Sequence, residues 1–294
     1  MRVLITGGTG FIGSMLLEQL SAAGHHCVVL TRMQPPPAGP ATYLHSLDEL
    51  SDDAEIDAVV NLAGASLADK RWSAGYKKMI VDSRLQTTAA LVALCRRLTT
   101  KPAVFLSGSA IGYYGAHADE LVDESTESGE GFAAQLCCDW EKEASAIDDL
   151  GIRLCVLRLG VVLDRDGGAF VEMARPFRLG IANWIGSGDQ YLSWIHRRDA
   201  VGAMLFLLEQ AQLRGVFNLT APQPVTSKSF CTLLQAQLRT WVSLPMPAWV
   251  MRMLVGEMAD ELLVQGQRVV PRNLLQAGFQ FQYASLEEAL PALV

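Results

Sequence analysis

The sequence predicts an α/β protein with a doubly wound parallel sheet and a small C-terminal lobe. Two observations predict this fold class. Short apolar, β-branched runs alternate with longer helical patterns over more than half of the 294-residue chain, which is typical of a parallel sheet covered by helices on both faces. A glycine-rich segment also follows the first apolar run directly and opens the first helical pattern.

The predicted elements follow one another in a regular order. The strands cover residues 3–5, 27–30, 58–62, 103–107 and 154–158, and the helices between them cover 11–23, 75–97 and 133–148. Gly24 stands just past the first helix, where a residue with positive φ often ends a helix. Beyond about residue 165 the alternation stops, and a glycine-rich stretch (180–188) precedes a helix near 199–211, a strand at 216–219 and a helix near 227–240.

We therefore expect three parts. Residues 1–165 form a nucleotide-binding domain, with returning segments that extend to about residue 225. Residues 166–243 form a substrate lobe together with the last elements of the sheet. Residues 244–294 form a small C-terminal appendage with helical patterns at 246–257 and 286–293.

Composition narrows the class of protein. The chain has 24 Lys and Arg against 31 Asp and Glu, a net charge of −7, which argues against a nucleic-acid partner. No apolar run is long enough for a membrane span, and no apolar leader precedes the first strand. The six cysteines lack a C-x-x-C spacing and the five histidines are scattered, so we expect reduced thiols, a cytoplasmic location and no metal site.

Residues 6–13, T-G-G-T-G-F-I-G, carry the clearest chemical signal. In a strand–loop–helix context, one glycine allows a tight turn, one lets the backbone approach a diphosphate, and one lets helix and strand pack closely. The helix N-terminus then offers N–H groups to the phosphates. The segment predicts a Rossmann dinucleotide site; the alternative is a glycine-rich turn that binds nothing.

Thr31 and Arg32 stand at the end of the second strand, where an NAD-binding protein carries an acidic residue for the ribose hydroxyls. A guanidinium can bind a 2′-phosphate, and a threonine hydroxyl can add a hydrogen bond. These residues predict NADP(H) as the cofactor. The alternative is that Arg32 is only a solvated charge at a strand end.

Three segments resemble the extended short-chain dehydrogenase/reductases: residues 61–64 (N-L-A-G), 106–115 (L-S-G-S-A-I-G-Y-Y-G) and 186–199 (G-S-G-D-Q to I-H-R-R-D). Residues 68–72 (A-D-K-R-W), 82–84 (D-S-R) and 176–180 (P-F-R-L-G) look like one atypical branch, the NAD(P)-dependent epimerase-like proteins with a C-terminal domain of unknown function. The resemblance implies a Rossmann fold and a nicotinamide cofactor.

The chain departs from that family at its catalytic pair. The family places a tyrosine and a lysine four residues apart on one helix face, so that the lysine assists the tyrosine as a proton donor. None of the six tyrosines here is followed by lysine at that spacing. Aligned on the family's motif, Ala133 takes the tyrosine position, Cys137 the lysine position and Arg84 that of an asparagine, and Ser109 alone is retained.

The resemblance then implies a set of site residues. The candidate catalytic residues are Ser109, Arg84, Cys137 and Tyr113. The candidate cofactor-binding residues are Gly7, Thr9, Gly10, Phe11, Ile12, Gly13, Thr31, Arg32, Leu62, Ala63, Gly64, Arg84, Ser107, Cys137, Gly160 and Val162. Cys137 is as readily a small buried hydrophobe, and packing is at least as good an interpretation for Tyr113 and Tyr114. For His196 a core role is the better one.

Leu192 replaces the arginine that nucleotide-sugar enzymes direct at the diphosphate, which disfavours a UDP- or GDP-sugar. Lys70, Arg71, Arg175 and Arg178 could bind a smaller anion or be ordinary surface charges. The first hypothesis is an NADP(H)-dependent oxidoreductase or epimerase-like enzyme acting on an unknown small molecule, with a homodimer open as a possibility. The alternative is a cofactor-binding sensor or interaction protein without catalysis.

Overall fold

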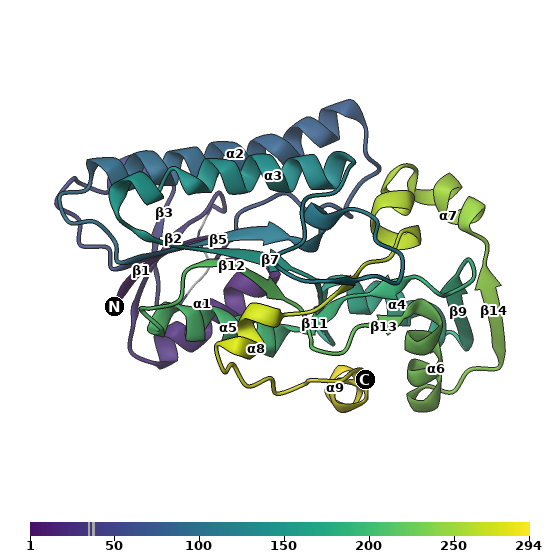
Figure 1. Cartoon of the computed structure of the whole chain (residues 1–294). Helices are drawn as coiled ribbons and strands as arrows, with labels where there is room; N and C mark the ends of the chain where they lie inside the picture. Colours follow the sequence, from purple (N-terminus) through teal and green to yellow (C-terminus); the bar gives the residue numbers. More distant parts are fainter. Residues whose placement is uncertain (35, 37–38) are drawn as a thin grey trace.

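The computed structural model describes residues 1–34, 36 and 39–294. Its centre is a parallel sheet in the order β12-β7-β5-β4-β1-β2-β3 (Figure 1). These strands are β1 (Arg2–Thr6), β2 (His26–Leu30), β3 (Thr42–Leu44), β4 (Ala58–Asn61), β5 (Val104–Ala110), β7 (Arg153–Leu159) and β12 (Gly215–Leu219). The order reverses between β1 and β4, and open α/β sheets bind their ligands at such a point, in the crevice outside the carboxyl ends of the strands.

Helices cover both faces of the sheet. Figure 1 shows α2 (Ala74–Arg97) and α3 (Phe132–Ser145) along one face, and α1 (Phe11–Ala22), α5 (Arg197–Glu209) and the short α8 (Arg272–Gln276) on the other. Successive strand residues point to opposite faces: Val3 and Ile5 pack with α1 and α5, whereas Leu4 packs with α2. The predicted doubly wound Rossmann fold is confirmed.

Single residues fix the end of α1 and the start of α2. Gly24 has φ +79° just past α1, as expected for a helix C-terminus. Ser73 begins α2, because its side chain accepts a hydrogen bond from the backbone N–H of Tyr76 at 3.2 Å. None of the helices in the described part of the chain is both long and apolar enough to cross a membrane.

The smaller lobe is built from short strand pairs and helices. Its elements are β8 (Val161–Asp164) paired with β11 (Trp194–His196), β9 (Ile181–Ile185) paired with β14 (Val242–Met246), β10 (Tyr191–Leu192) paired with β13 (Val225–Thr226), and the helices α4 (Gly168–Arg178) and α6 (Ser227–Gln237). Phe170, Trp194 and Phe230 form its core. The sequence did not predict β8 or α4. The pattern of α4 is obscured by glycines at 167 and 168 and by a proline at 176.

The C-terminal appendage is interleaved with both lobes. It contains α7 (Ala248–Val255), β15 (Arg268–Val269), α8 and α9 (Leu286–Leu293). β15 pairs in parallel with β6 (Leu121–Val122), which follows β5 in the chain. Leu286, Leu290 and Leu293 of α9 complete the core of the smaller lobe. The segment therefore packs as part of the molecule rather than as a separate unit.

Candidate functional site

The glycine loop between β1 and α1 has the shape of a phosphate cradle. Gly7 has φ +70°, and a Cβ atom there would lie 2.6 Å from the carbonyl oxygen of Leu62. A Cβ at Gly13 would lie 2.2 Å from the carbonyl oxygen of Gly7. A Cβ at Gly10 would meet only that same oxygen, at 3.1 Å. Gly7 and Gly13 thus serve the fold, while Gly10 leaves open space above the loop.

Gly10 is also the N-cap of α1 and brings no side-chain acceptor to the first turn of the helix. The first N–H groups of a helix lack intrahelical partners, and here they belong to Phe11, Ile12 and Gly13. Thr9 and Gly10 are exposed at the rim. The loop therefore has room and free N–H donors for a diphosphate, the ligand group that its sequence predicts.

The turn after β4 is fixed by a buried asparagine. Asn61, which is fully buried, accepts a hydrogen bond from the Thr6 hydroxyl at 2.7 Å and donates to the Thr88 hydroxyl at 2.8 Å. The Thr6 hydroxyl in turn accepts from the N–H of Ala63 at 3.2 Å. These contacts hold residues 62–64 against the glycine loop, on the side of the crevice where the sequence predicted the adenosine.

Thr31 and Arg32 differ in the burial and the hydrogen bonding of their side chains. Thr31 is buried, and its hydroxyl accepts from the N–H of Met33 at 3.1 Å. Arg32 is exposed at the end of β2 and has no hydrogen bond or ion pair with any residue that the structure describes. The guanidinium is free to meet a 2′-phosphate, whereas the threonine shapes the turn beneath it.

Arg84 lies across the exposed backbone of Gly64. A Cβ at Gly64 would be 2.9 Å from Cζ of Arg84, and that carbon is 5.2 Å from the centre of the Trp140 ring on α3. Its Nη1 donates to the carbonyl oxygens of Ala65 and Ile80, both at 3.1 Å. Burial lowers the pKa of Arg84 from its ordinary value. The partly buried guanidinium of Arg84 thus lies between the turn after β4 and helix α3.

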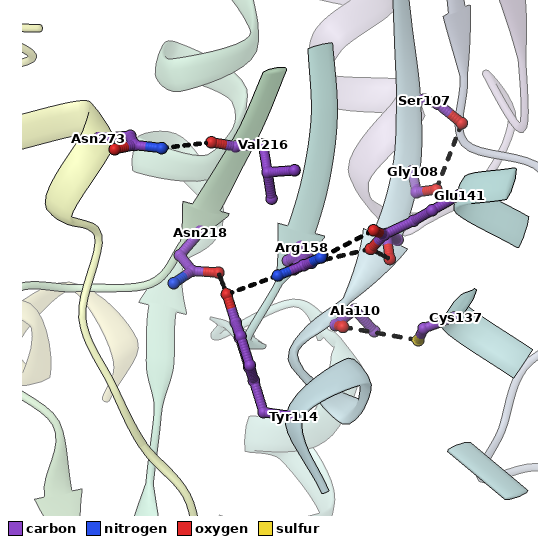
Figure 2. A network of polar contacts seen from close by, with 11 residues as sticks. Ser107, Gly108, Ala110, Tyr114, Cys137, Glu141, Arg158, Val216, Asn218 and Asn273 are labelled. Atoms are coloured by element: carbon purple, nitrogen blue, oxygen red, sulfur yellow. Dashed lines mark hydrogen bonds and ion pairs between the residues drawn. The ribbon is translucent and has the colours of Figure 1, made fainter. Parts of the chain in front are cut away.

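Ser109 belongs to a buried polar network around Glu141 and Arg158, two residues that Figure 2 labels. Its hydroxyl donates to Glu141 Oε1 at 2.6 Å. The same carboxylate accepts from Arg158 Nε and Nη2, both at 2.8 Å. An ionised carboxylate only accepts, so the Ser109 proton is held by Glu141 and turned away from any ligand.

The network continues from Arg158 to Tyr114. The Tyr114 hydroxyl accepts from Arg158 Nη1 at 3.0 Å and donates to Asn218 Oδ1 at 2.7 Å (Figure 2). Burial raises the pKa of Tyr114 to about 12. Burial alone would lower the pKa of Arg158, but the hydrogen bonds and charge of Glu141 outweigh it and raise the value. Tyr114 is therefore a link in the network and remains a neutral phenol.

Tyr113 is the other tyrosine of this segment, in the short 3₁₀ turn η2 (Ile111–Tyr114). Its ring centre lies 3.3 Å from Cζ of Arg158, and its side chain is half-buried. Its hydroxyl has no partner among the residues that the structure describes. Tyr113 is thus the one of the two tyrosines whose phenol can reach a ligand.

Cys137 lies beside Ser109 and Arg84 on the inner face of α3. Its thiol donates to the carbonyl oxygen of Ala110 at 3.5 Å (Figure 2). Burial raises its pKa to about 11, so it is a thiol at neutral pH. Ala133, one turn earlier, is also buried, and a Cβ at Gly112 would lie 3.2 Å from its methyl group. The geometry favours the packing interpretation of Cys137.

The remaining predicted residues lie along the same edge of the sheet. Ser107 is fully buried in β5, and Val162 is half-buried in β8. Gly160, between β7 and β8, leaves no room for a side chain, because a Cβ there would lie 2.7 Å from the carbonyl oxygen of Ser193. Gly160 and Val162 follow directly on the strand that carries Arg158.

His196 and the basic candidates lie elsewhere. His196 is buried as the N-cap of α5, where its ring accepts from the N–H of Arg198 at 3.1 Å, and burial lowers its pKa to about 4. This agrees with a core role. Arg71 donates to the carbonyl oxygen of Met253 at 3.2 Å, while Lys70, Arg175 and Arg178 are exposed. The structure does not gather these four cations into one group.

Sequence reasoning missed the ionic part of the network. Arg158 stands in an otherwise apolar strand pattern, which is a signal for a buried ion pair, because buried arginines are almost always paired. Glu141 was not among the predicted site residues. Glu261, whose carboxylate accepts from the N–H groups of Phe132 and Ala133 at 3.0 and 2.7 Å, gave no signal at all.

Two protein-family models match this chain. The model of the NAD dependent epimerase/dehydratase family matches residues 3–220, and that of a domain of unknown function, DUF1731, matches residues 246–293. An epimerase family protein of Mycobacterium leprae is 39% identical over 98% of this chain and 94% of its own length.

Two solved structures are also similar. The human epimerase family protein SDR39U1, crystallised with NADPH, has a TM-score of 0.87 and 34% identity over 100% of this chain and 99% of its own. A nucleoside-diphosphate sugar epimerase from Corynebacterium glutamicum has a TM-score of 0.81 and 29% identity over 100% of this chain and 58% of its own. The protein described here belongs to the NAD dependent epimerase/dehydratase family, in a branch with a C-terminal DUF1731 segment.

Proposed function

We propose that this protein binds NADPH at the carboxyl edge of its sheet and acts as an oxidoreductase or epimerase-like enzyme on a small molecule. The observation that carries the proposal is Arg32, an exposed guanidinium at the end of β2 that has no partner among the residues that the structure describes. A carboxylate there would repel a 2′-phosphate, whereas a guanidinium binds it. The similar human protein was crystallised with NADPH.

The residues present fit the cofactor from end to end. The glycine loop would hold the diphosphate, Arg32 the 2′-phosphate and residues 62–64 the adenosine side. Ser107, Cys137, Gly160 and Val162 would line the nicotinamide side. When bound, NADPH supplies a hydride donor.

The reacting end offers two groups of its own. Arg84 provides a cation near the position where the family carries lysine on α3, because its guanidinium packs over Trp140, one turn from Cys137. Tyr113 provides a phenol whose hydroxyl no described residue contacts by a hydrogen bond. In this proposal Arg84 stabilises negative charge on a substrate or ribose oxygen, and Tyr113 delivers or accepts the proton.

The six free cysteines agree with a cytoplasmic location.

The cofactor assignment is tested by titration calorimetry. NADPH should bind at least about tenfold more tightly than NADH, a difference of about 1.4 kcal/mol. Arg32→Asp should abolish that preference, and Arg239→Asp, at another exposed arginine far along the chain, should leave it intact. Equal affinities of the unchanged protein for the two nucleotides would remove the assignment of Arg32.

A second function, a cofactor-binding sensor without catalysis, is favoured by specific observations. The Ser109 proton is held by Glu141, the Cys137 pKa is raised to about 11, and Ala133 carries no acid. The two functions are separated by following NADPH absorbance while a library of small carbonyl compounds is added. Consumption dependent on Arg84 and Tyr113 supports the enzyme, and its absence across the library supports the sensor.

A further inference from the structure

The C-terminal segment 257–270 runs along the reacting end of the crevice. The backbone oxygen of Gln267 accepts from the Ser193 hydroxyl at 2.6 Å, and that hydroxyl accepts from the N–H of Val269 at 2.8 Å. Ser193 is the residue whose carbonyl oxygen closes the space above Gly160. On its other side the segment pairs with β6, which follows β5 in the chain. The segment is thus tied to both lobes beside the predicted nicotinamide site.

Helix α3, which carries Ala133, Cys137 and Glu141, begins without a cap of its own. Its N-cap residue is Gly131, at φ +103°, which has no side chain to accept from the first N–H groups. An uncapped helix start leaves these donors to water or to a remote partner. The helix that faces Ser109 therefore depends on another element for a fixed first turn.

Glu261, in the π-helical turn η4 (Asp260–Val264), supplies that partner. Its Oε1 accepts from the N–H of Phe132 at 3.0 Å, and its Oε2 from the N–H of Ala133 at 2.7 Å. A Cβ at Gly131 would lie 3.2 Å from Oε1, so the glycine leaves room for the carboxylate. Two charge-assisted hydrogen bonds at the positive end of a helix dipole make this a strong cap.

The capped residue is Ala133, which takes the position of the family's tyrosine. We propose that Glu261 is a positioning residue for the nicotinamide end of the crevice: it fixes the first turn of α3, and through it the inner face that holds Cys137 and Glu141 against Ser109. The inference rests on the proposed function, because it assumes that NADPH binds in this crevice. It gives the DUF1731 segment a role in the cofactor site.

A merely structural cap would act on the whole protein alike. A positioning role acts on one end of the cofactor only, because the glycine loop and Arg32 lie on β1, α1 and β2, away from α3. Two probes separate the ends: NADPH occupies both, and adenosine 2′,5′-bisphosphate occupies only the adenosine end.

Titration calorimetry with both probes tests the proposal on the full chain. Glu261→Ala should lower the affinity for NADPH about tenfold, equal to about 1.4 kcal/mol. The affinity for the bisphosphate should stay within about twofold of that of the unchanged protein. Glu261→Gln keeps one acceptor oxygen and should restore NADPH affinity to within about threefold of the unchanged protein. Glu257→Ala is the matched control, since Glu257 lies on the same segment and pairs with Lys77 at 2.6 Å instead; it should change neither affinity.

Two outcomes would overturn the inference. Either Glu261→Ala lowers the affinities for both probes by the same factor, or it changes neither affinity. If the alanine variant does not fold, Glu261→Asp, which keeps the charge but shortens its reach, is put through the same comparison. If the unchanged protein binds neither probe, the proposed function itself fails, so the two failures are distinguishable.

Discussion

The two ends of the crevice differ in whether their polar groups are paired with other groups of the protein. At the phosphate end, the N–H groups of the first turn of α1 and the Arg32 guanidinium are left without protein acceptors in the described part of the chain. At the reacting end, Ser109, Glu141, Arg158 and Tyr114 satisfy one another. We call the first end, whose donors are unpaired, the open end. We call the second end, whose polar groups are paired with one another, the satisfied end.

The difference separates the predicted cofactor end of this chain from its predicted reacting end. Glycines and a strand-end arginine are enough to hold a dinucleotide, and they are in place. On the alignment predicted from the sequence, the positions of the family's tyrosine and lysine hold two small buried residues, Ala133 and Cys137. Arg84 of α2 packs over Trp140 of α3. In the proposed function, chemistry at that end depends on Arg84 and Tyr113, because each keeps polar atoms without a partner in the described part of the chain.

The largest expected effect comes from breaking the satisfied end. Glu141→Ala leaves the Arg158 guanidinium, only 4% exposed, without its counter-charge, which should cost about 3–5 kcal/mol of unfolding free energy. Urea denaturation measures the loss. Asp148→Ala removes the exposed partner of Arg214 and should cost less than about 1 kcal/mol. Similar losses in the two variants would mean that the network is not desolvated as described.

The next effect comes from filling the open end. Gly10→Val puts a side chain into the space above the loop, so NADPH affinity should fall by about 100-fold or more, about 2.7 kcal/mol, while circular dichroism stays unchanged. Gly13→Ala, whose methyl group would lie 2.2 Å from the Gly7 oxygen, should lower both affinity and stability. Retained binding in Gly10→Val would place the phosphates elsewhere.

The open end could be predicted from the sequence because its determinants are local. The loop, the turn after β4 and the end of β2 are short segments whose residue types directly report backbone shape and charge. The same holds for the strands of the sheet, whose apolar runs are continuous. Only β3, a three-residue edge strand, was missed on that side.

The satisfied end could not be predicted because its partners lie far apart along the chain. The hydroxyl of Tyr114 meets Asn218 across 104 positions, and Ala133 meets Glu261 across 128. No periodicity encodes such pairs. An alignment on the family's motif could identify what stands at positions 133 and 137, but not that Arg84 packs beside them or that a C-terminal glutamate caps their helix.

A smaller effect tests a buried group that sequence reasoning took for core. The His196 pKa of about 4 lies below the ordinary value of 6.5, so between those pH values the unfolded chain binds a proton that the native protein does not. Stability should therefore fall by about 2 kcal/mol from pH 7 to pH 5. His196→Asn keeps an N-cap acceptor and should flatten this part of the pH profile of urea midpoints. An identical profile would mean that His196 is solvated.

The smallest expected effect separates the two candidates for the nicotinamide side. Cys137→Ala removes a buried thiol that donates only to a backbone oxygen, so NADPH affinity should stay within about twofold. Arg84→Ala removes the free guanidinium edge and should weaken NADPH by about fivefold or more, roughly 1 kcal/mol. Calorimetry that ranks the two variants in the reverse order would make the thiol the cofactor contact.

A crystal structure of the protein with NADPH tests the central claim most directly. We expect the 2′-phosphate on the Arg32 guanidinium, the diphosphate on the N–H groups of Phe11 to Gly13, and the nicotinamide ribose nearer to Arg84 than to the Cys137 sulfur. The Ser109–Glu141–Arg158 contacts should persist unchanged. A cofactor whose 2′-phosphate turns away from Arg32, or whose binding opens that network, would contradict the division between an open and a satisfied end.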